Sequence, residues 1–386
     1  MKDVAIVSGV RTAFARAHKG GFRDTRPDDL AAAAIKRAVA DSGADPAEVG
    51  DVILGCAMPE GEQGLNIARI ALLAAGLPVE VSGMTINRFC SSGLNSIVIA
   101  ADRIAAGAMD VAVAGGVESM TMIPMTGTKV SLNPTLVDSF PAVYTPMGLT
   151  AEKVALQHGI DRAAQDRFAQ RSHERAVAAQ KSGAFAEEIV GVDATAYDDA
   201  GKKVSARIER DEFPRADSSL ESLGKLRPVF DAQGSVTAGN SSPLTDGAAA
   251  VVLMSADRAK KAGKTLGWVR QFAVAGVPPD VMGIGPVPAV RKVLAQAGKA
   301  IGDIDLFELN EAFAAQSLAV CKELGIPEER VNVNGGAIAL GHPLGVSGTR
   351  LVITALHELA RRKARFAVVT MCIGGGMGAA AIIERA

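Results

Sequence analysis

The chain has 386 residues, with 41 lysine or arginine residues against 42 aspartate or glutamate residues. This near-zero net charge excludes a large basic surface for nucleic acid and a polybasic membrane patch, and no segment reaches the roughly 20 uninterrupted apolar residues of a membrane helix. Length and an apolar content of 48% predict two or three domains, with small molecules or further copies of the chain as partners. No membrane anchor is visible.

The cysteine content also limits the possible classes of protein. Cys56, Cys90, Cys321 and Cys372 are too few for a disulfide framework and too far apart for a zinc motif. The sequence therefore predicts free thiols, no metal centre and a reducing compartment, the cytoplasm.

From the amino terminus onward, short runs rich in valine and isoleucine alternate with alanine-rich helical runs. VAIVSG is followed by DDLAAAAIKRAVADSG, DVILGC and LNIARIALLAAGL. This alternation is typical of an α/β fold with buried strands.

The same order of elements returns in the second part of the chain at a nearly constant offset. GDVILGC is matched by GDIDLFELN, SSGLNSIVIAADRI by VSGTRLVITALHEL, and DVAVAGG by FAVVTMCIGGG. Chance alignment of glycine-rich turns is the alternative, but three landmarks in one order predict two similar α/β halves.

The predicted domain limits follow from this repeat. The amino-terminal half comprises residues 1–117 and is completed by about 244–265, and the carboxy-terminal half comprises residues 266–386. Residues 118–243 are rich in methionine, proline and threonine loops and are expected to form an inserted loop domain. Long insertions in compact proteins are usually functional.

Cys90 follows a strand-like run and precedes Ser-Ser-Gly and a long helix with apolar periodicity. Its sulfur should lie near the amino terminus of that helix, where free N–H groups and the helix dipole favour a thiolate. The alternative is a small buried hydrophobic residue, because free cysteines are often buried.

Among the histidines, His342 is set apart by its flanking residues Gly341 and Pro343, which make regular secondary structure unfavourable. By the repeat, it lies opposite Cys90. The other histidines are expected in a basic loop or in solvated helical runs: His18, His158, His173 and His357.

Further polar groups follow strands of the second half, which is where α/β proteins place ligands. Asn310 and Glu311 end one such strand, and Cys372 precedes the glycines of CIGGGMG. A tight turn between two core strands would explain these glycines but not the adjacent cysteine.

Six motifs, NRFCSSGLNS, GGVESM, GNSSPLTDGAAA, NEAFA, GHPLGVSGTR and CIGGGMG, occur in the order and spacing of the thiolases. The resemblance covers essentially the whole chain. It implies two mixed-sheet halves in a five-layer αβαβα arrangement, a loop domain that covers the active site and binds coenzyme A (CoA), and homodimers or homotetramers. CoA is then a substrate, and no permanently bound cofactor is implied.

Site roles also follow from this resemblance. Cys90 is the nucleophile, His342 accepts its proton, and Cys372 is a second acid/base thiol. One oxyanion hole uses His342 and a water held by Asn310, and the other uses the N–H groups of Cys90 and Gly374. Residues that match CoA contacts, and that could otherwise be ordinary surface or core residues, are Met147, Arg215, Ser222, Ser242 and Phe313.

The predicted reaction is cleavage of a 3-ketoacyl-CoA by CoA through an acyl-cysteine. NRFCSSGL and the sequence Pro-Met-Gly at 146–148 resemble the degradative thiolases, whereas the biosynthetic acetoacetyl-CoA thiolases, with NQxCGSGL and His-Met-Gly, are the alternative. A ketoacyl synthase would have a histidine or asparagine in place of Cys372. A silent lipid-binding relative would lack Cys90, His342 or Cys372.

Overall fold

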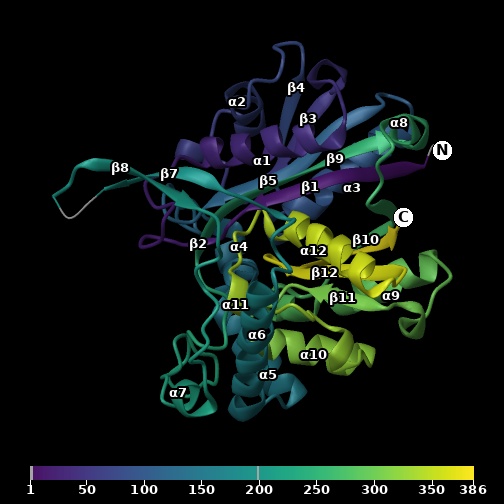
Figure 1. The fold of residues 1–386 in the computed structure, drawn as a ribbon. Helices are drawn as coiled ribbons and strands as arrows, with labels where there is room; N and C mark the ends of the chain where they lie inside the picture. Colours follow the sequence, from purple (N-terminus) through teal and green to yellow (C-terminus); the bar gives the residue numbers. More distant parts are fainter. Residues whose placement is uncertain (1–2, 198–199) are drawn as a thin grey trace.

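The computed structural model describes residues 3–197 and 200–386, so small parts of the predicted first half (1–2) and loop domain (198–199) lie outside it. A large mixed sheet runs through the molecule (Figure 1). In their order of pairing, its strands are β11 (Leu306–Leu309), β12 (Phe366–Ile373), β13 (Met377–Arg385), β10 (Gly267–Gly276), β1 (Val4–Thr12), β9 (Thr245–Ser255), β5 (Val111–Ser119), β3 (Asp51–Gly55) and β4 (Ser82–Ile86). The short strands β2 (Ala15–Arg16) and β6 (Ile189–Val190) pair with β9 and β1.

The sheet consists of two halves that meet at β1 and β10. Only two residue pairs, Ala5 with Trp268 and Ile6 with Gly267, join these strands. Moving outward from this seam, β1, β9, β5 and β3 of the first half correspond to β10, β13, β12 and β11 of the second. In each half the two outermost of these strands are parallel, and the second strand is antiparallel to its neighbours. The predicted two-half α/β fold is confirmed.

Helices cover both outer faces of the sheet and fill the space between its halves. The outer helices are α1 (Pro27–Ser42) and α2 (Ile67–Ala74) on the first half, and α9 (Pro286–Gln296) and α10 (Ala314–Leu324) on the second. Between the halves lie α3 (Ser92–Ala105) and α12 (Ser347–Arg362), which share one apolar core with strands of both halves. The predicted layers, helix, sheet, helix, sheet and helix, are therefore present (Figure 1).

Local sequence explains where these helices begin and end. α1 has Pro27 at its first position, where a missing N–H costs nothing. It ends at Gly43, whose φ of +73° suits glycine. The alanine-rich face between these ends is buried against the sheet. None of the helices in the described residues is long and apolar enough to cross a membrane.

The chain between β5 and β9 forms a region beside the sheet. Its helices α5, α6 and α7 lie together, while the hairpin of β7 and β8 extends away from the sheet (Figure 1). Besides β6, this region contains α4 (Pro134–Ser139), α5 (Met147–His158), α6 (Arg162–Ser182), β7 (Val192–Tyr197), β8 (Lys203–Ile208) and α7 (Leu220–Gly224). The predicted limits of 118 and 243 stay a prediction. The remaining α-helices of the described residues are α8 (Ala256–Ala262) and α11 (Ala337–Leu340), and short 3-10 helices occur in several of the connections.

A buried arginine holds this region to the sheet. Arg11 of β1 donates to Glu188 at 2.8 Å and, through both terminal nitrogens, to Asp211 at 2.7 and 2.8 Å. Asp211 also accepts the Phe14 N–H at 2.8 Å. Since all three charged side chains are buried, loss of any partner would leave an uncompensated charge in the core.

Candidate active site

Cys90 lies in the short turn Phe89–Ser91, directly before α3, and is 2% exposed. The turn is strained, because Phe89 has a φ of +44°, a conformation unfavourable for an aromatic residue. Two side chains hold it: Asn87 accepts the Phe89 N–H at 2.8 Å, and the Ser92 hydroxyl donates to the Phe89 carbonyl at 2.7 Å. The cysteine is thereby fixed at the predicted helix start.

The prediction that the helix start favours a Cys90 thiolate is wrong for the resting protein. Burial raises the pKa of Cys90 to about 11, although the N–H groups of Gly374 and of Cys90 itself point to the sulfur and lower it. A helix start offers partial charges only, and these do not offset the loss of water around a fully buried anion. Cys90 is a neutral thiol until a base removes its proton.

His342 is a candidate for that base. Its Nε2 lies 3.2 Å from Asn310 Nδ2, which can only donate, so Nε2 is the acceptor. Its Nδ1 lies 2.5 Å from the Ser347 hydroxyl oxygen, and that hydroxyl donates to the Pro343 carbonyl at 3.1 Å. The ring proton therefore belongs on Nδ1. Burial, with a contribution from Arg350, lowers the pKa of His342 to about 3, so the ring is neutral and its one basic lone pair, on Nε2, accepts from Asn310.

Cys372 lies near the end of β12 and is fully buried. Burial raises its pKa well above the usual value, and proximity to Cys90 raises it further. The side chains packed around it are apolar: Met147, Ala151, Val236, Met282, Ala312 and Phe313. A second thiol therefore lies close to the first, in a dry environment.

The glycines after Cys372 have two different roles. Gly375 and Gly376 have φ values of +80° and +84°, as a tight turn between β12 and β13 requires. Gly374 has no such backbone demand, but its N–H points to the Cys90 sulfur. A side chain at Gly374 would project to within 3.7 Å of the Phe89 ring and 3.9 Å of the Met147 sulfur. A tight turn therefore explains Gly375 and Gly376 but does not explain Gly374.

The predicted CoA contacts fall into two groups. Met147 and Phe313 belong to the cluster around Cys372, and the half-buried Ser242 donates its N–H to the Ala312 carbonyl at 3.0 Å. Arg215 and Ser222 are exposed and belong to the segment around α7. The structure therefore brings the first three to the site and leaves the last two on the surface.

The prediction of solvated helical histidines is wrong. His173 is buried beneath the Arg215 backbone, whose N–H contacts its Nδ1 at 3.3 Å. Burial and the Arg215 charge lower the pKa of His173 to about 4. His158 and His357 each contact a glutamate, at 3.3 Å. Helical periodicity alone does not reveal that a second segment covers these faces.

Glu118 belongs to the motif GGVESM, and the structure places this residue, for which the sequence predicts no role, beside the site. Its carboxylate is 1% exposed and accepts the N–H groups of Ala57 and Gly345, both at 2.8 Å. Cys90 packs against Ala57 and against Leu344, the neighbour of Gly345. Glu118 thus ties together two segments that contact the nucleophile. A charged residue within the apolar strand AVAGGVES is the signal that could have identified it.

We expect Glu118→Gln to destabilise the protein and disturb the site. The amide NH₂ would face main-chain N–H groups that have no other acceptor there, so the free energy of unfolding should fall by about 3 kcal/mol. Displacement of the two loops should slow acylation of Cys90 by at least about tenfold. Urea unfolding and rapid-quench acylation measure the two effects, with the exposed α6 residue changed in Glu174→Gln as control. Stability within about 0.5 kcal/mol of the wild type would contradict this role.

The two-half α/β fold holds two buried thiols close together, and it places a neutral imidazole on the segment whose Leu344 packs against Cys90. Such groups suit an enzyme that transfers acyl groups through cysteine. Comparison with known families identifies the group within this class. The models described as "Thiolase, N-terminal domain" and "Thiolase, C-terminal domain" match residues 4–257 and 263–385. The chain belongs to the thiolase family.

Individual relatives agree with this family. A 3-ketoacyl-CoA thiolase of Bacillus subtilis is 50% identical, with 100% of both chains covered. A peroxisomal 3-ketoacyl-CoA thiolase A of Mus musculus is 47% identical over 99% of this chain and 91% of the relative. The crystal structure of the Bacillus anthracis acetyl-CoA acetyltransferase matches with a TM-score of 0.91 and 41% identity, covering 100% of this chain and 99% of that chain.

Proposed function

We propose that this chain is a degradative thiolase, which cleaves a 3-ketoacyl-CoA with CoA into acetyl-CoA and an acyl-CoA shortened by one acetyl unit, as in fatty-acid β-oxidation. The observation that carries this proposal is the burial of Cys90 and Cys372 close together, with the Gly374 N–H directed at the first sulfur. One thiol suits the acyl carrier and the other the proton carrier.

In the first half-reaction, the Cys90 sulfur attacks the 3-keto carbon while its proton passes to Nε2 of His342. The neutral state and tautomer of His342 support this step. The N–H groups of Gly374 and Cys90, which point to the sulfur, suit the oxyanion that forms beside it. The bond between the second and third acyl carbons then breaks, leaving an acyl-Cys90 and an acetyl-CoA carbanion.

Cys372 protonates that carbanion to release acetyl-CoA, and its thiolate later takes the proton of the incoming CoA thiol. The CoA sulfur then attacks the acyl carbon of acyl-Cys90, the Cys90 thiolate leaves, and the proton held on Nε2 of His342 returns to it, which regenerates the free enzyme. His342, protonated on Nε2 during the reaction, and Asn310 are assigned to the oxyanion hole at the thioester oxygen, with a water held by Asn310. The apolar surroundings of Cys372 support a proton transfer without competition from bulk water.

The CoA cleft is assigned to the boundary between the two halves and the loop domain 118–243. Met147, Ser242 and Phe313 are placed along the pantetheine arm, and Arg215 and Ser222 at the nucleotide. The packing of the first group near Cys372 and the exposure of the second support this order. CoA acts as a substrate in this scheme.

The function is tested by the absorbance of the 3-ketoacyl-CoA enolate, which should disappear when CoA and enzyme are added. The products should be acetyl-CoA and the shortened acyl-CoA in equal amounts. Absence of cleavage with every chain length would overturn the proposal.

We expect kcat/KM for thiolysis to rise from acetoacetyl-CoA to substrates of about six to ten carbons. Each methylene buried against the apolar cluster contributes about 0.8 kcal/mol, or nearly fourfold, until the pocket is full. Pro146 precedes Met147 of this cluster, so Pro146→His should lower the medium-chain rate more than the acetoacetyl-CoA rate. Pro141→His, at an exposed position of the same loop, is the control. A steep decline beyond acetoacetyl-CoA would favour the alternative, a biosynthetic acetyl-CoA acetyltransferase.

A homodimer, or a tetramer of two dimers, is the proposed assembly. β4 is an edge strand whose residues are only partly buried, and Leu65 nearby is 91% exposed. A second copy pairing at this edge would cover both features, and sedimentation would show a monomer if this is wrong.

A cytoplasmic location is supported by the four free, buried cysteines, and cell fractionation tests it.

A further inference from the structure

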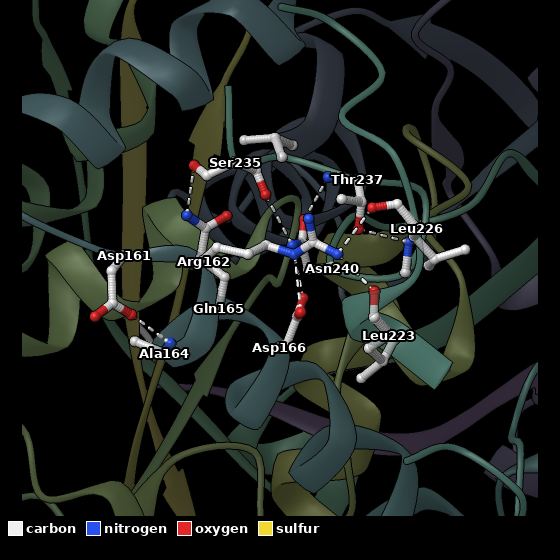
Figure 2. A network of polar contacts seen from close by, with 12 residues as sticks. Asp161, Arg162, Ala164, Gln165, Asp166, Leu223, Leu226, Ser235, Thr237 and Asn240 are labelled. Atoms are coloured by element: carbon white, nitrogen blue, oxygen red, sulfur yellow. Dashed lines mark hydrogen bonds and ion pairs between the residues drawn. The ribbon is translucent and has the colours of Figure 1, made fainter. Parts of the chain in front are cut away.

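A polar network connects α6, α7 and the loop that leads to β9 (Figure 2). At its centre is Arg162, the first residue of α6. Its guanidinium donates to Asp166 at 2.8 Å and to the carbonyls of Leu223 and Leu226 at 2.5 and 3.1 Å. Leu223 belongs to α7, so one side chain joins the start of α6 to the end of α7.

Asp166 extends the network in the opposite direction. Its second oxygen accepts from Asn240 Nδ2 at 3.1 Å. The same amide donates to the Ser235 carbonyl at 3.2 Å, and its oxygen accepts the Thr237 N–H at 2.8 Å. The Asp166 side chain is 6% exposed and Asn240 is fully buried. This carboxylate therefore links the arginine that holds α7 to residues 235–240.

The loop at Asn240 is also bound to the active-site region by main-chain hydrogen bonds. Ala314 N–H donates to the Asn240 carbonyl at 2.9 Å, and Ser242 N–H donates to the Ala312 carbonyl at 3.0 Å. Between these two alanines lies Phe313, which packs in the cluster around the second thiol. The pantetheine end of the cleft thus has its own anchors, whereas α7 receives charged hydrogen bonds from Arg162.

We propose that Arg162 and Asp166 are positioning residues for the nucleotide end of CoA. The inference rests on the proposed function, since it requires that CoA binds here. α7 carries Ser222, and exposed Arg215 and Arg227 lie on either side of it in the sequence. Guanidinium groups suit the diphosphate and the 3′-phosphate of CoA. The Arg162 guanidinium donates to two carbonyls and a carboxylate at once, and it therefore fixes the position of α7 relative to α6.

The test compares CoA with pantetheine, which lacks the nucleotide. Calorimetric titration gives the Kd for CoA without any turnover, and thiolysis gives kcat/KM for each thiol as acyl acceptor. We expect Arg162→Gln and Asp166→Asn each to raise the Kd for CoA by about tenfold, while kcat/KM with pantetheine changes by less than about twofold. The double variant should be no worse than the weaker-binding single variant, because both residues act through one network.

Controls keep the outcome decisive. Glu174→Gln changes an exposed carboxylate of α6 whose side chain contacts only Gln170 among the hydrogen bonds of the described residues, and it should bind CoA as the wild type does. Arg162→Lys keeps the positive charge but not the several N–H donors of the guanidinium, so its Kd for CoA should lie between those of the wild type and of Arg162→Gln. If Arg162→Gln or Asp166→Asn does not fold, the Kd of Arg162→Lys is the test. An equal loss with CoA and pantetheine, or an unchanged Kd for CoA, would overturn the inference. Absence of thiolysis in the wild type would refute the proposed function. The role of Arg162 and Asp166 in CoA binding would then be decided by the calorimetric Kd values.

Discussion

Replacing Cys90 with alanine should abolish acyl transfer, with a loss of at least about 10⁴-fold in thiolysis. Incubation of the wild type with acetyl-CoA, followed by acid quench, should leave one added acetyl group on the peptide that contains Cys90. Because the resting thiol is neutral, with a pKa of about 11, its alkylation by iodoacetamide should keep accelerating from pH 6 to pH 10. A preformed ion pair would instead give a plateau at neutral pH.

Cys321→Ala is the matched control for this experiment. Cys321 is also buried and free, and burial raises its pKa to about 12, but it lies on α10 beside a pocket of about 410 Å³ that contains neither active-site thiol. Its variant should retain acylation. An acetyl group found on Cys321 or Cys56 would show that the nucleophile is assigned incorrectly.

Replacing Cys372 with alanine should separate the two thiols. Cys90 and His342 remain, so acylation by acetyl-CoA should continue, whereas exchange of solvent deuterium into the methyl group of acetyl-CoA should fall by at least about 10²-fold. Exchange reports removal of a proton from that carbon, which is the step assigned to Cys372. Mass spectrometry of recovered acetyl-CoA measures it.

Exchange at the wild-type rate in this variant would place the base elsewhere. Glu311 is the nearest carboxylate in the sequence to the Asn310 motif, but its oxygens accept from Ser172 at 2.6 Å, Asn332 at 2.8 Å and the Ile338 N–H at 3.2 Å. These bonds connect α6 to the second half and hold the carboxylate in place. The structure therefore assigns Glu311 an anchoring role. Glu311→Gln should lower the free energy of unfolding and have little effect on the rate of deuterium exchange.

Much of the fold could be predicted from the sequence because its determinants are local. Buried parallel strands require continuous apolar runs, and the helices that follow them begin at small residues such as Ser92 and Ser347. These patterns recur in both halves, so the repeat was visible along the chain. The motifs around Cys90, His342 and Cys372 also lie at junctions between elements, where short sequence carries most of the information.

Only the tertiary structure decided the chemical state of the site. Cys90 is buried by Ala57, Met120 and Leu344, which come from three separate segments, and this burial reverses the thiolate predicted from the helix start alone. Glu118 acquires its role from N–H donors 61 and 227 residues away. Protonation and hydrogen-bond satisfaction depend on how much water is excluded and which groups replace it. Both are set by contacts between distant segments, which a local pattern of residues does not encode.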